Sequence, residues 1–223
     1  MSFNTLGSKA WDFGGNTPVW LGKVRPVPFG GTLKKAYLIQ NALYQAGMPV
    51  NLSADTNGEI TPVVAFKVTA SSQPGSGTGD TITVRPCGNI VPSTDTVLMK
   101  LGADFTTAGA AYKPSKVVKN TSDPTLYDLS FTESQLGTIA VGDVLVEGAS
   151  EGASIAPVAV PNGYLYNDIC LNDIDVTDES ACATGAVVKF HGEGLLIDRN
   201  PAGALLADRL QSLIPNVLLI KGV

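Results

Sequence analysis

Glycine and proline occur along the whole chain, and the interruptions they cause in regular secondary structure limit the fold more than any other feature of the sequence. The 223 residues include 24 glycines and 14 prolines, and both residue types are unfavourable inside helices. The apolar runs between them are short, and the dipeptide Asn57-Gly58 is a strong hairpin signal. Short strands separated by turns are typical of all-β folds. The sequence therefore predicts a mainly β protein with a barrel- or sandwich-like body.

Individual strands are expected where short apolar runs stand between turn residues. In the segment 81–85, Ile82 and Val84 should face the core, while the polar residues beside them face solvent. The final run, 217–220, is wholly apolar, which is typical of a well-covered strand. Further strands are expected at 63–68, 96–100, 116–119, 138–141, 144–147, 155–160, 164–166, 174–176 and 187–190.

One helix is expected, near the C-terminus at about 202–214. Asn200 is a favourable N-cap residue, and Pro201 is favourable in the first helical turn. Pro215 should end the helix. Between them, leucines recur at the spacing of one helical face, at Leu206, Leu210 and Leu213.

The chain divides into an N-terminal arm and a β-rich body. Residues 1–36 show neither helical nor strand periodicity, and they contain both tryptophans of the chain. We therefore expect an extended arm at 1–36 and a β-rich body at 37–223. The prolines between positions 157 and 161 leave open whether the body is one domain or is split into 37–157 and 158–223.

Charge is distributed unevenly between the two parts. Residues 1–35 carry five basic residues and one acidic residue, net +4, whereas residues 120–223 carry four basic and fourteen acidic residues, net −10. The whole chain has a net charge of −5, so nucleic acid and membranes are not expected as partners. No apolar run is typical of a membrane span or a secretory signal. The basic arm is either a solvated tail or the segment that meets an acidic surface.

The aromatic and basic side chains of the arm are the candidate partner-binding residues. An exposed aromatic ring gains little unless it is buried, and aromatic residues and arginine are common anchors of protein interfaces. The surface that buries them is either the protein's own body or a neighbouring subunit. The candidates are Trp11, Phe13, Trp20, Arg25, Phe29, Lys34 and Lys35.

The three cysteines and the single histidine indicate neither a metal centre nor a catalytic site. Cys87, Cys170 and Cys182 are odd in number and form no Cys-x-x-Cys pair, so we expect free thiols and a reducing compartment rather than a zinc site. A β-rich hydrolase would have to use His191, which has no nucleophile motif beside it and reads as a strand end. No catalytic residue and no cofactor are therefore expected.

Two further motifs fail on their spacing. The segment 75–79 is glycine-rich, but a strand is expected after it, so it lacks the helix N-terminus that holds a phosphate. The acidic segment 173–179 departs from the spacing of a calcium loop, because Asp178 stands where that loop needs a glycine. We read the first as a hairpin loop and the second as an acidic turn that could bind calcium only adventitiously.

Three passages resemble the capsid decoration and head-fibre proteins of tailed bacteriophages. The first is 42–50, with Gly47-Met48-Pro49, continuing through 60–68. The second is 136–145, whose Val141-Gly142-Asp143 forms an apolar-Gly-Asp entry to a strand, together with 117–118. The third is the ending 187–217, with its strand, helix and Ile214-Pro215. The arm and the segment 112–128 depart from that group.

This resemblance implies a structural virion protein without enzymatic activity, made in the host cytoplasm and placed on the outer capsid surface. Its partners would be the major capsid protein, bound through the arm, and further copies of itself, with a trimer favoured. The alternative is a carbohydrate- or receptor-binding module of a phage fibre or tail, which needs an exposed aromatic platform on the body. The residues available for that platform are Tyr112, Tyr127, Tyr164 and Tyr166.

Overall fold

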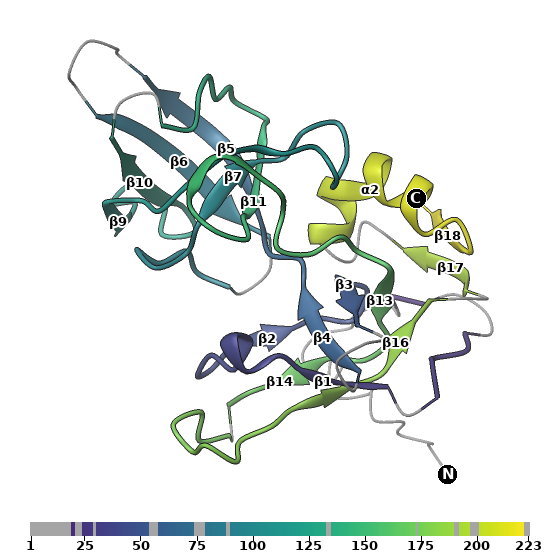
Figure 1. Ribbon diagram of the computed structural model, residues 1–223. Helices are drawn as coiled ribbons and strands as arrows, with labels where there is room; N and C mark the ends of the chain where they lie inside the picture. Colours follow the sequence, from purple (N-terminus) through teal and green to yellow (C-terminus); the bar gives the residue numbers. More distant parts are fainter. Residues whose placement is uncertain are drawn as a thin grey trace. The chain divides into compact units, whose positions relative to one another are not determined.

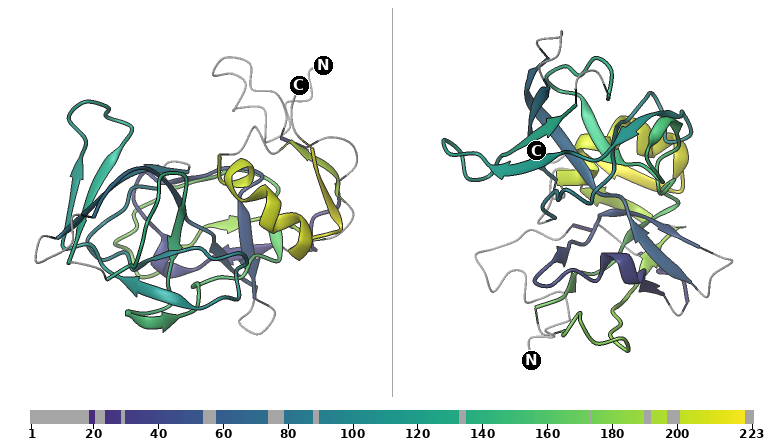
Figure 2. Two further views of the ribbon diagram at one scale, coloured as in Figure 1. Left: turned by 90° about the horizontal axis from the view of Figure 1, so that it is seen from above. Right: turned by 60° about the vertical axis from the view of Figure 1, so that its left-hand side comes forward.

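The computed structural model describes residues 19–20, 24–28, 30–53, 58–73, 79–87, 90–132, 135–172, 174–189, 192–196 and 201–220. Within them the protein is mainly β, with one short α-helix near the C-terminus, and the predicted fold class is confirmed (Figure 1, Figure 2). The chain forms two compact units. Unit 1 comprises residues 1–62 and 161–223, and unit 2 comprises residues 63–160.

Unit 1 is built on a six-stranded sheet that closes on itself. Its spatial order is β15-β1-β4-β3-β13-β16. Only Ala186 separates the two strands at its ends, so the segment 184–188 pairs with β1 at its start and with β13 at its end. One stretch of chain therefore joins both edges into a barrel-like ring. The strands are β1 (Gly31–Leu33), β3 (Pro49–Leu52), β4 (Glu59–Pro62), β13 (Gly163–Leu165), β15 (Thr184–Gly185) and β16 (Val187–Val188).

Glycines let the strands of this small barrel approach closely. A Cβ atom at Gly31 would lie 2.4 Å from the carbonyl oxygen of Gly58, and one at Gly163 would lie 2.9 Å from the carbonyl oxygen of Val188 on the neighbouring strand. Both distances are far inside van der Waals contact, so a larger residue would push the strands apart. One face of this sheet is lined by buried apolar side chains that the strand register places together, Leu33, Val50, Leu52, Ile60, Leu165 and Val187, and these fill the barrel interior.

Six further elements of unit 1 lie between or after these strands. A 3-10 turn, η2 (Lys35–Tyr37), follows β1, and β2 (Leu43–Tyr44) pairs with β14 (Ile169–Cys170). Near the C-terminus, β17 (Gly192–Leu196) and β18 (Val217–Ile220) pair in parallel, and α2 (Pro201–Leu213) connects them (Figure 1).

The predicted C-terminal helix is confirmed, with one change in its buried face. Leu206 and Leu210 are fully buried, as expected, but Leu213 is only half-buried. Ile214, just after the helix, is buried instead. Its N–H donates to the carbonyl oxygen of Leu210 at 2.9 Å, so the last helical turn carries Ile214 onto the apolar face.

An eight-stranded antiparallel sheet forms unit 2, in the spatial order β12-β8-β7-β11-β5-β6-β10-β9. The alternation predicted for 81–85 is confirmed, because Ile82 and Val84 are fully buried while Thr81 and Arg85 are exposed. The strands are β5 (Ala65–Ser72), β6 (Asp80–Pro86), β7 (Leu98–Lys100), β8 (Gly109–Tyr112), β9 (Lys116–Lys119), β10 (Tyr127–Phe131), β11 (Val144–Glu147) and β12 (Gly152–Ile155).

Three strand predictions were wrong or displaced. The segment 138–141 leads into a turn, in which the N–H of Asp143 donates to the Ala140 carbonyl oxygen at 3.1 Å and Gly142 has a φ of 94°. The segment 174–176 belongs to a turn closed from Asp178 to Asp175. The strand expected at 155–160 lies earlier, at β12. Aspartates next to small polar residues favour such turns over strands.

The arm predicted at 1–36 includes residues that are part of the barrel. β1 begins at Gly31, and both of its edges are paired within the sheet. Residues 1–18 lie outside the described residues. The body divides at Pro62 and Pro161, with both ends of the chain in unit 1, rather than at position 157 alone.

The chain enters and leaves unit 2 at one place on its sheet. Ala65, at the start of β5, pairs with Val146 of β11. Val158, near the exit, donates its N–H to the carbonyl oxygen of Glu147 at 2.9 Å, and Glu147 directly follows Val146 in β11. Entry and exit are therefore neighbours, which is typical of an inserted domain with its own core.

We predict that residues 63–160 fold when expressed alone, because their core and their sheet are complete within that range. The fragment should unfold in one cooperative denaturant transition and give dispersed amide NMR signals. A matched fragment, 63–120, lacks β10, β11 and β12, which removes the strand that joins β5 to β7, and it should stay unfolded. A non-cooperative transition for 63–160 would contradict the assignment of unit 2 as an autonomous domain.

Candidate functional site

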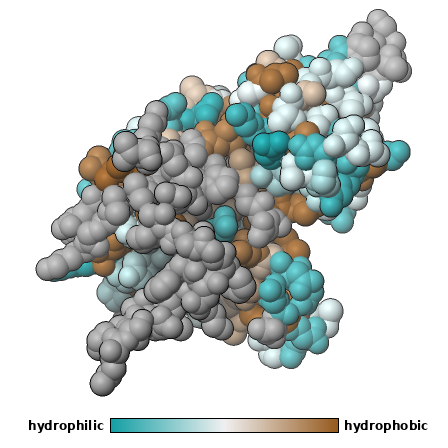
Figure 3. Space-filling view, turned by 180° about the vertical axis from the view of Figure 1, so that it is seen from behind, coloured by the Kyte–Doolittle hydropathy of each residue, from teal (hydrophilic) through white to brown (hydrophobic). Residues whose placement is uncertain are grey.

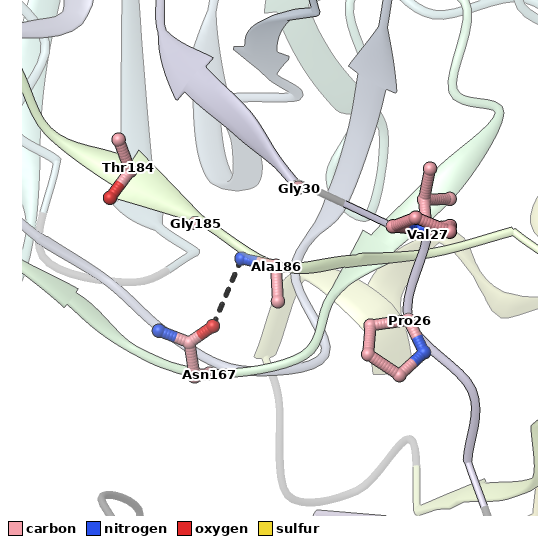
Figure 4. A pocket seen from close by; sticks show the side chains of 8 residues that line it. Pro26, Val27, Gly30, Asn167, Thr184, Gly185 and Ala186 are labelled. Atoms are coloured by element: carbon pink, nitrogen blue, oxygen red, sulfur yellow. Dashed lines mark hydrogen bonds between the residues drawn. The ribbon is translucent and has the colours of Figure 1, made fainter.

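The barrel seam lies at Ala186, where the closing segment changes from one neighbouring strand to another. Backbone groups left unpaired at such a crossing would be costly to bury. Here the Ala186 N–H donates to Oδ1 of Asn167 at 3.0 Å, and its carbonyl oxygen accepts from the N–H of Tyr166 at 2.8 Å. The side chain of Asn167 thus takes the place of a missing strand (Figure 4).

The described part of the arm is fastened beside this seam. The N–H of Val27 donates to the carbonyl oxygen of Val187 at 2.7 Å. Nε1 of Trp20 donates to the carbonyl oxygen of Tyr166 at 3.0 Å. One backbone bond and one side-chain bond therefore tie the root of the arm, defined here as residues 19–20 and 24–28, to the closing segment and to the segment that follows β13.

Trp20 also packs on two tyrosines. Its ring centroid lies 6.4 Å from that of Tyr164, with the planes at 75°, and 6.2 Å from that of Tyr166, at 37°. Tyr164 is fully buried, whereas Tyr166 is 42% exposed. Edge-on and tilted ring pairs at these distances are favourable. Trp20 is thus a fixed point of the arm on its own body.

The buried Tyr164 hydroxyl has no hydrogen-bond partner among the described residues. The same holds for one other buried side-chain group there, Oγ of Ser71 in unit 2. Burial raises the pKa of Tyr164 above its ordinary value of 10.0, because the charged phenolate would be desolvated. The hydroxyl therefore stays neutral at physiological pH and supplies no base.

A shallow groove of about 460 Å³ lies between the arm root and the seam. One wall is formed by residues 26–28 and Gly30, and the other by Asn167 and residues 184–186 (Figure 4). Gly30 has a φ of 59°, and a Cβ atom there would lie 2.3 Å from the Gly185 carbonyl oxygen, so the two walls meet at a pair of glycines. None of the lining side chains is ionisable. The backbone groups of Ala186 and the N–H of Val27 are already paired within the chain, so the groove offers shape rather than acid–base chemistry.

Lys35 contacts an acidic turn of its own chain. Its Nζ donates to the carbonyl oxygen of Glu179 at 3.1 Å. The N–H and hydroxyl of Ser180 both donate to Oδ1 of Asp178 at 2.8 Å, and Thr177 binds Asp175 in the same way. These bonds hold the pKa of Asp178 below its ordinary value of 3.8, and the Lys35 charge adds to the effect. The turn is therefore organised internally.

The predicted partner-binding residues have different environments. Trp20 packs on its own barrel and Lys35 binds its own acidic turn, whereas Arg25 is exposed and Lys34 is half-buried. The structure thus brings Trp20 to the seam and leaves Arg25 exposed. Trp11, Phe13 and Phe29 lie outside the described residues.

Among the described residues, the cysteines and acidic side chains considered as metal-binding or catalytic groups do not come together in a site. No group of three or more His, Cys, Asp or Glu side chains in these residues could hold a metal ion. Cys87 is buried, which raises its pKa to about 11, and Cys170 and Cys182 are exposed free thiols. No helix in this part of the chain is long and apolar enough to cross a membrane. His191, Asp173 and the loop 74–78 lie outside the described residues.

The four tyrosines proposed as an aromatic platform are divided between the two units, two in each. Tyr112 lies on β8 and Tyr127 on β10, with four strands between them in the order of the unit 2 sheet. Tyr164 is buried, which leaves Tyr166 as the exposed ring in unit 1. On the face drawn in Figure 3, the described apolar residues likewise form separate groups rather than one continuous patch.

Sequence reasoning missed Asn167, which pairs the seam, and the seating of Trp20 between Tyr164 and Tyr166. The alternation of Tyr164, Leu165 and Tyr166 was a usable signal for a strand with aromatic faces. Nothing in the sequence indicates that Asn167 pairs with Ala186, which is nineteen residues away.

Comparison with known proteins adds no assignment, since no known family, curated protein or solved structure matches the chain.

We predict that Trp20→Phe lowers the free energy of unfolding by about 1 kcal/mol, the usual net contribution of one hydrogen bond. Trp20→Ala, which also removes the ring contacts, should cost about 2 kcal/mol. Tyr166→Phe is the matched control, because the bond uses its backbone oxygen, and it should leave stability unchanged. Denaturant titration measures all three, and a Trp20→Phe variant as stable as the parent would rule out the indole bond.

We also predict that the Asp178 carboxyl titrates below pH 3.8, because its ionised form accepts two bonds from Ser180. A depressed folded-state pKa stabilises the fold above the unfolded-state pKa, and this contribution is lost as the pH falls through the folded-state value. In an NMR pH titration, Ser180→Ala should raise the pKa more than Lys35→Met does. The opposite order would show that the lysine charge dominates.

Proposed function

We propose that this chain is a structural, non-enzymatic protein of a tailed-phage virion, which decorates the outer capsid or forms head fibres there. The three passages of sequence resemblance suggest this class. The structural observation that carries the proposal is the fastening of the arm root to a closed barrel by Val27 and Trp20. An attachment segment needs such a root, because force applied to the arm must pass into a folded body.

The geometry supports attachment better than catalysis. The groove beside the arm root is lined by Pro26, Val27, Pro28, Gly30, Asn167 and residues 184–186, which carry no nucleophile activated by a base. Its small residues leave room for an extended polypeptide. A binding role would thus use the shape of the groove, with specificity coming from the arm.

Within this proposal the arm residues have two roles. Trp20 is a root residue that sets where the arm leaves the barrel. Trp11, Phe13 and Phe29 are the proposed apolar contacts with the capsid, and the exposed Arg25 is the proposed contact with capsid acids. Lys34 is half-buried and serves as a secondary contact, while Lys35 is already committed to its own acidic turn.

We predict that deleting residues 1–18, which keeps Trp20 and Val27, leaves a folded body that no longer joins capsids assembled from the major capsid protein. The variant Trp11→Ala/Phe13→Ala should lower occupancy per shell at least tenfold, the effect of about 1.4 kcal/mol. Tyr112→Ala/Tyr127→Ala, on unit 2, is the matched control and should bind fully. Copy number per particle is measured by quantitative mass spectrometry.

Full occupancy of the 1–18 deletion would overturn the arm as the anchor. A chain that fails to bind capsids with its arm intact, but binds glycans on an array, would instead favour the carbohydrate- or receptor-binding alternative, with Tyr166 as its exposed ring.

A further inference from the structure

β18 is an apolar strand at the edge of a small sheet. It pairs in parallel with β17, and no other described strand joins the two. Its residues are Val217, Leu218, Leu219 and Ile220, without a charge or a proline among them, and Leu218 is 55% exposed. Parallel strands are usually enclosed in larger sheets. An apolar edge strand that no charged residue, proline or covering segment protects can pair with a strand of another chain.

The opposite situation holds at the β9 edge of unit 2. There Lys116 and Lys119 stand at the two ends of the strand, and both are exposed. Lysines on an edge strand oppose strand addition because a second strand would have to bury or crowd their charges. β18 has no such residue, so a different feature must occupy its edge.

Gln211 of α2 occupies that edge. Its Nε2 donates to the carbonyl oxygen of Val217 at 3.2 Å, and its Oε1 accepts from the N–H of Leu219 at 3.0 Å. Residues two apart in a strand direct their backbone groups to the same side, and this is the side that β17 leaves free. The carboxamide therefore reproduces the donor and acceptor that one peptide group of a further strand would present.

The same device recurs at two other places in the fold. Gln73 accepts from the N–H of Ile139 at 2.8 Å and donates to the carbonyl oxygen of Gly137 at 2.7 Å. Asn162 accepts from the N–H of Leu52 at 2.9 Å and donates to its carbonyl oxygen at 3.1 Å. In each case a side-chain amide pairs with both an N–H and a carbonyl oxygen of another backbone segment, as Gln211 does at β18.

We propose that Gln211 is an edge guard, whose carboxamide keeps β18 from pairing with β18 of a second copy of this chain. The intramolecular bonds already satisfy the Val217 and Leu219 groups and cost no translational freedom, so an incoming strand has to displace them. A second copy is the relevant competitor because the two edges would be identical, uncharged and apolar, with no like-charge repulsion between them.

The test replaces Gln211 with methionine, which keeps the length and helix propensity of the side chain but neither hydrogen bond. Sedimentation velocity of the full chain should then show self-association at a concentration at least tenfold below that of the parent. Ser212→Met is the matched control, because it adds the same apolar side chain at the neighbouring exposed position of α2, and it should behave as the parent does.

A second substitution identifies the surface involved. Gln211→Met/Leu218→Lys places a charge on β18 itself and should return the association to the level of the parent. The proposal is overturned if Gln211→Met sediments as the parent does at every concentration, or if Leu218→Lys fails to reverse its association. Should Gln211→Met not fold, Gln211→Ala is measured in the same way, and the same two results decide.

Discussion

The closure of the unit 1 barrel by the segment 184–188 is the constraint on which the rest of this structure depends. One short stretch pairs with β1 through Thr184 and Gly185 and with β13 through Val187 and Val188. A sheet that closes has no free edge at that point, and its strands are held from both sides. The cost is a crossing at Ala186, where the polar groups of the backbone are paired by Asn167 and Tyr166 instead of by a strand.

The arm root and the insertion of unit 2 both follow from this closure. Val27 binds the closing segment at Val187, and Trp20 binds the chain just after β13, so the root contacts the two sides of the seam. Unit 2 leaves the barrel after β4 and returns at β13, strands that both flank β3 in the sheet. The ring can therefore close although 98 residues intervene between Pro62 and Pro161.

Much of the secondary structure could be predicted from the sequence, because it depends on local patterns. The alternation around Ile82 and Val84 and the leucine spacing of α2 each produced the expected element. Long-range pairing could not be predicted in this way. Nothing local indicates that Asn167 pairs with Ala186, that β1 belongs to the barrel, or that Lys35 contacts Glu179. The segment 138–141 was predicted as a strand from its apolar residues, whereas the Ala140 N–H donates to the Asp143 side chain in a turn that only the fold reveals.

The most direct test of this account is native-state hydrogen exchange at the Val27 amide, whose partner is the Val187 carbonyl oxygen. If the arm root is part of the closed barrel, this amide exchanges as slowly as that of Leu33, which binds Ala183 beside the seam. Exchange of Val27 at the rate of an unprotected amide, with Leu33 still protected, would show that the barrel closes without holding the arm and would contradict the account.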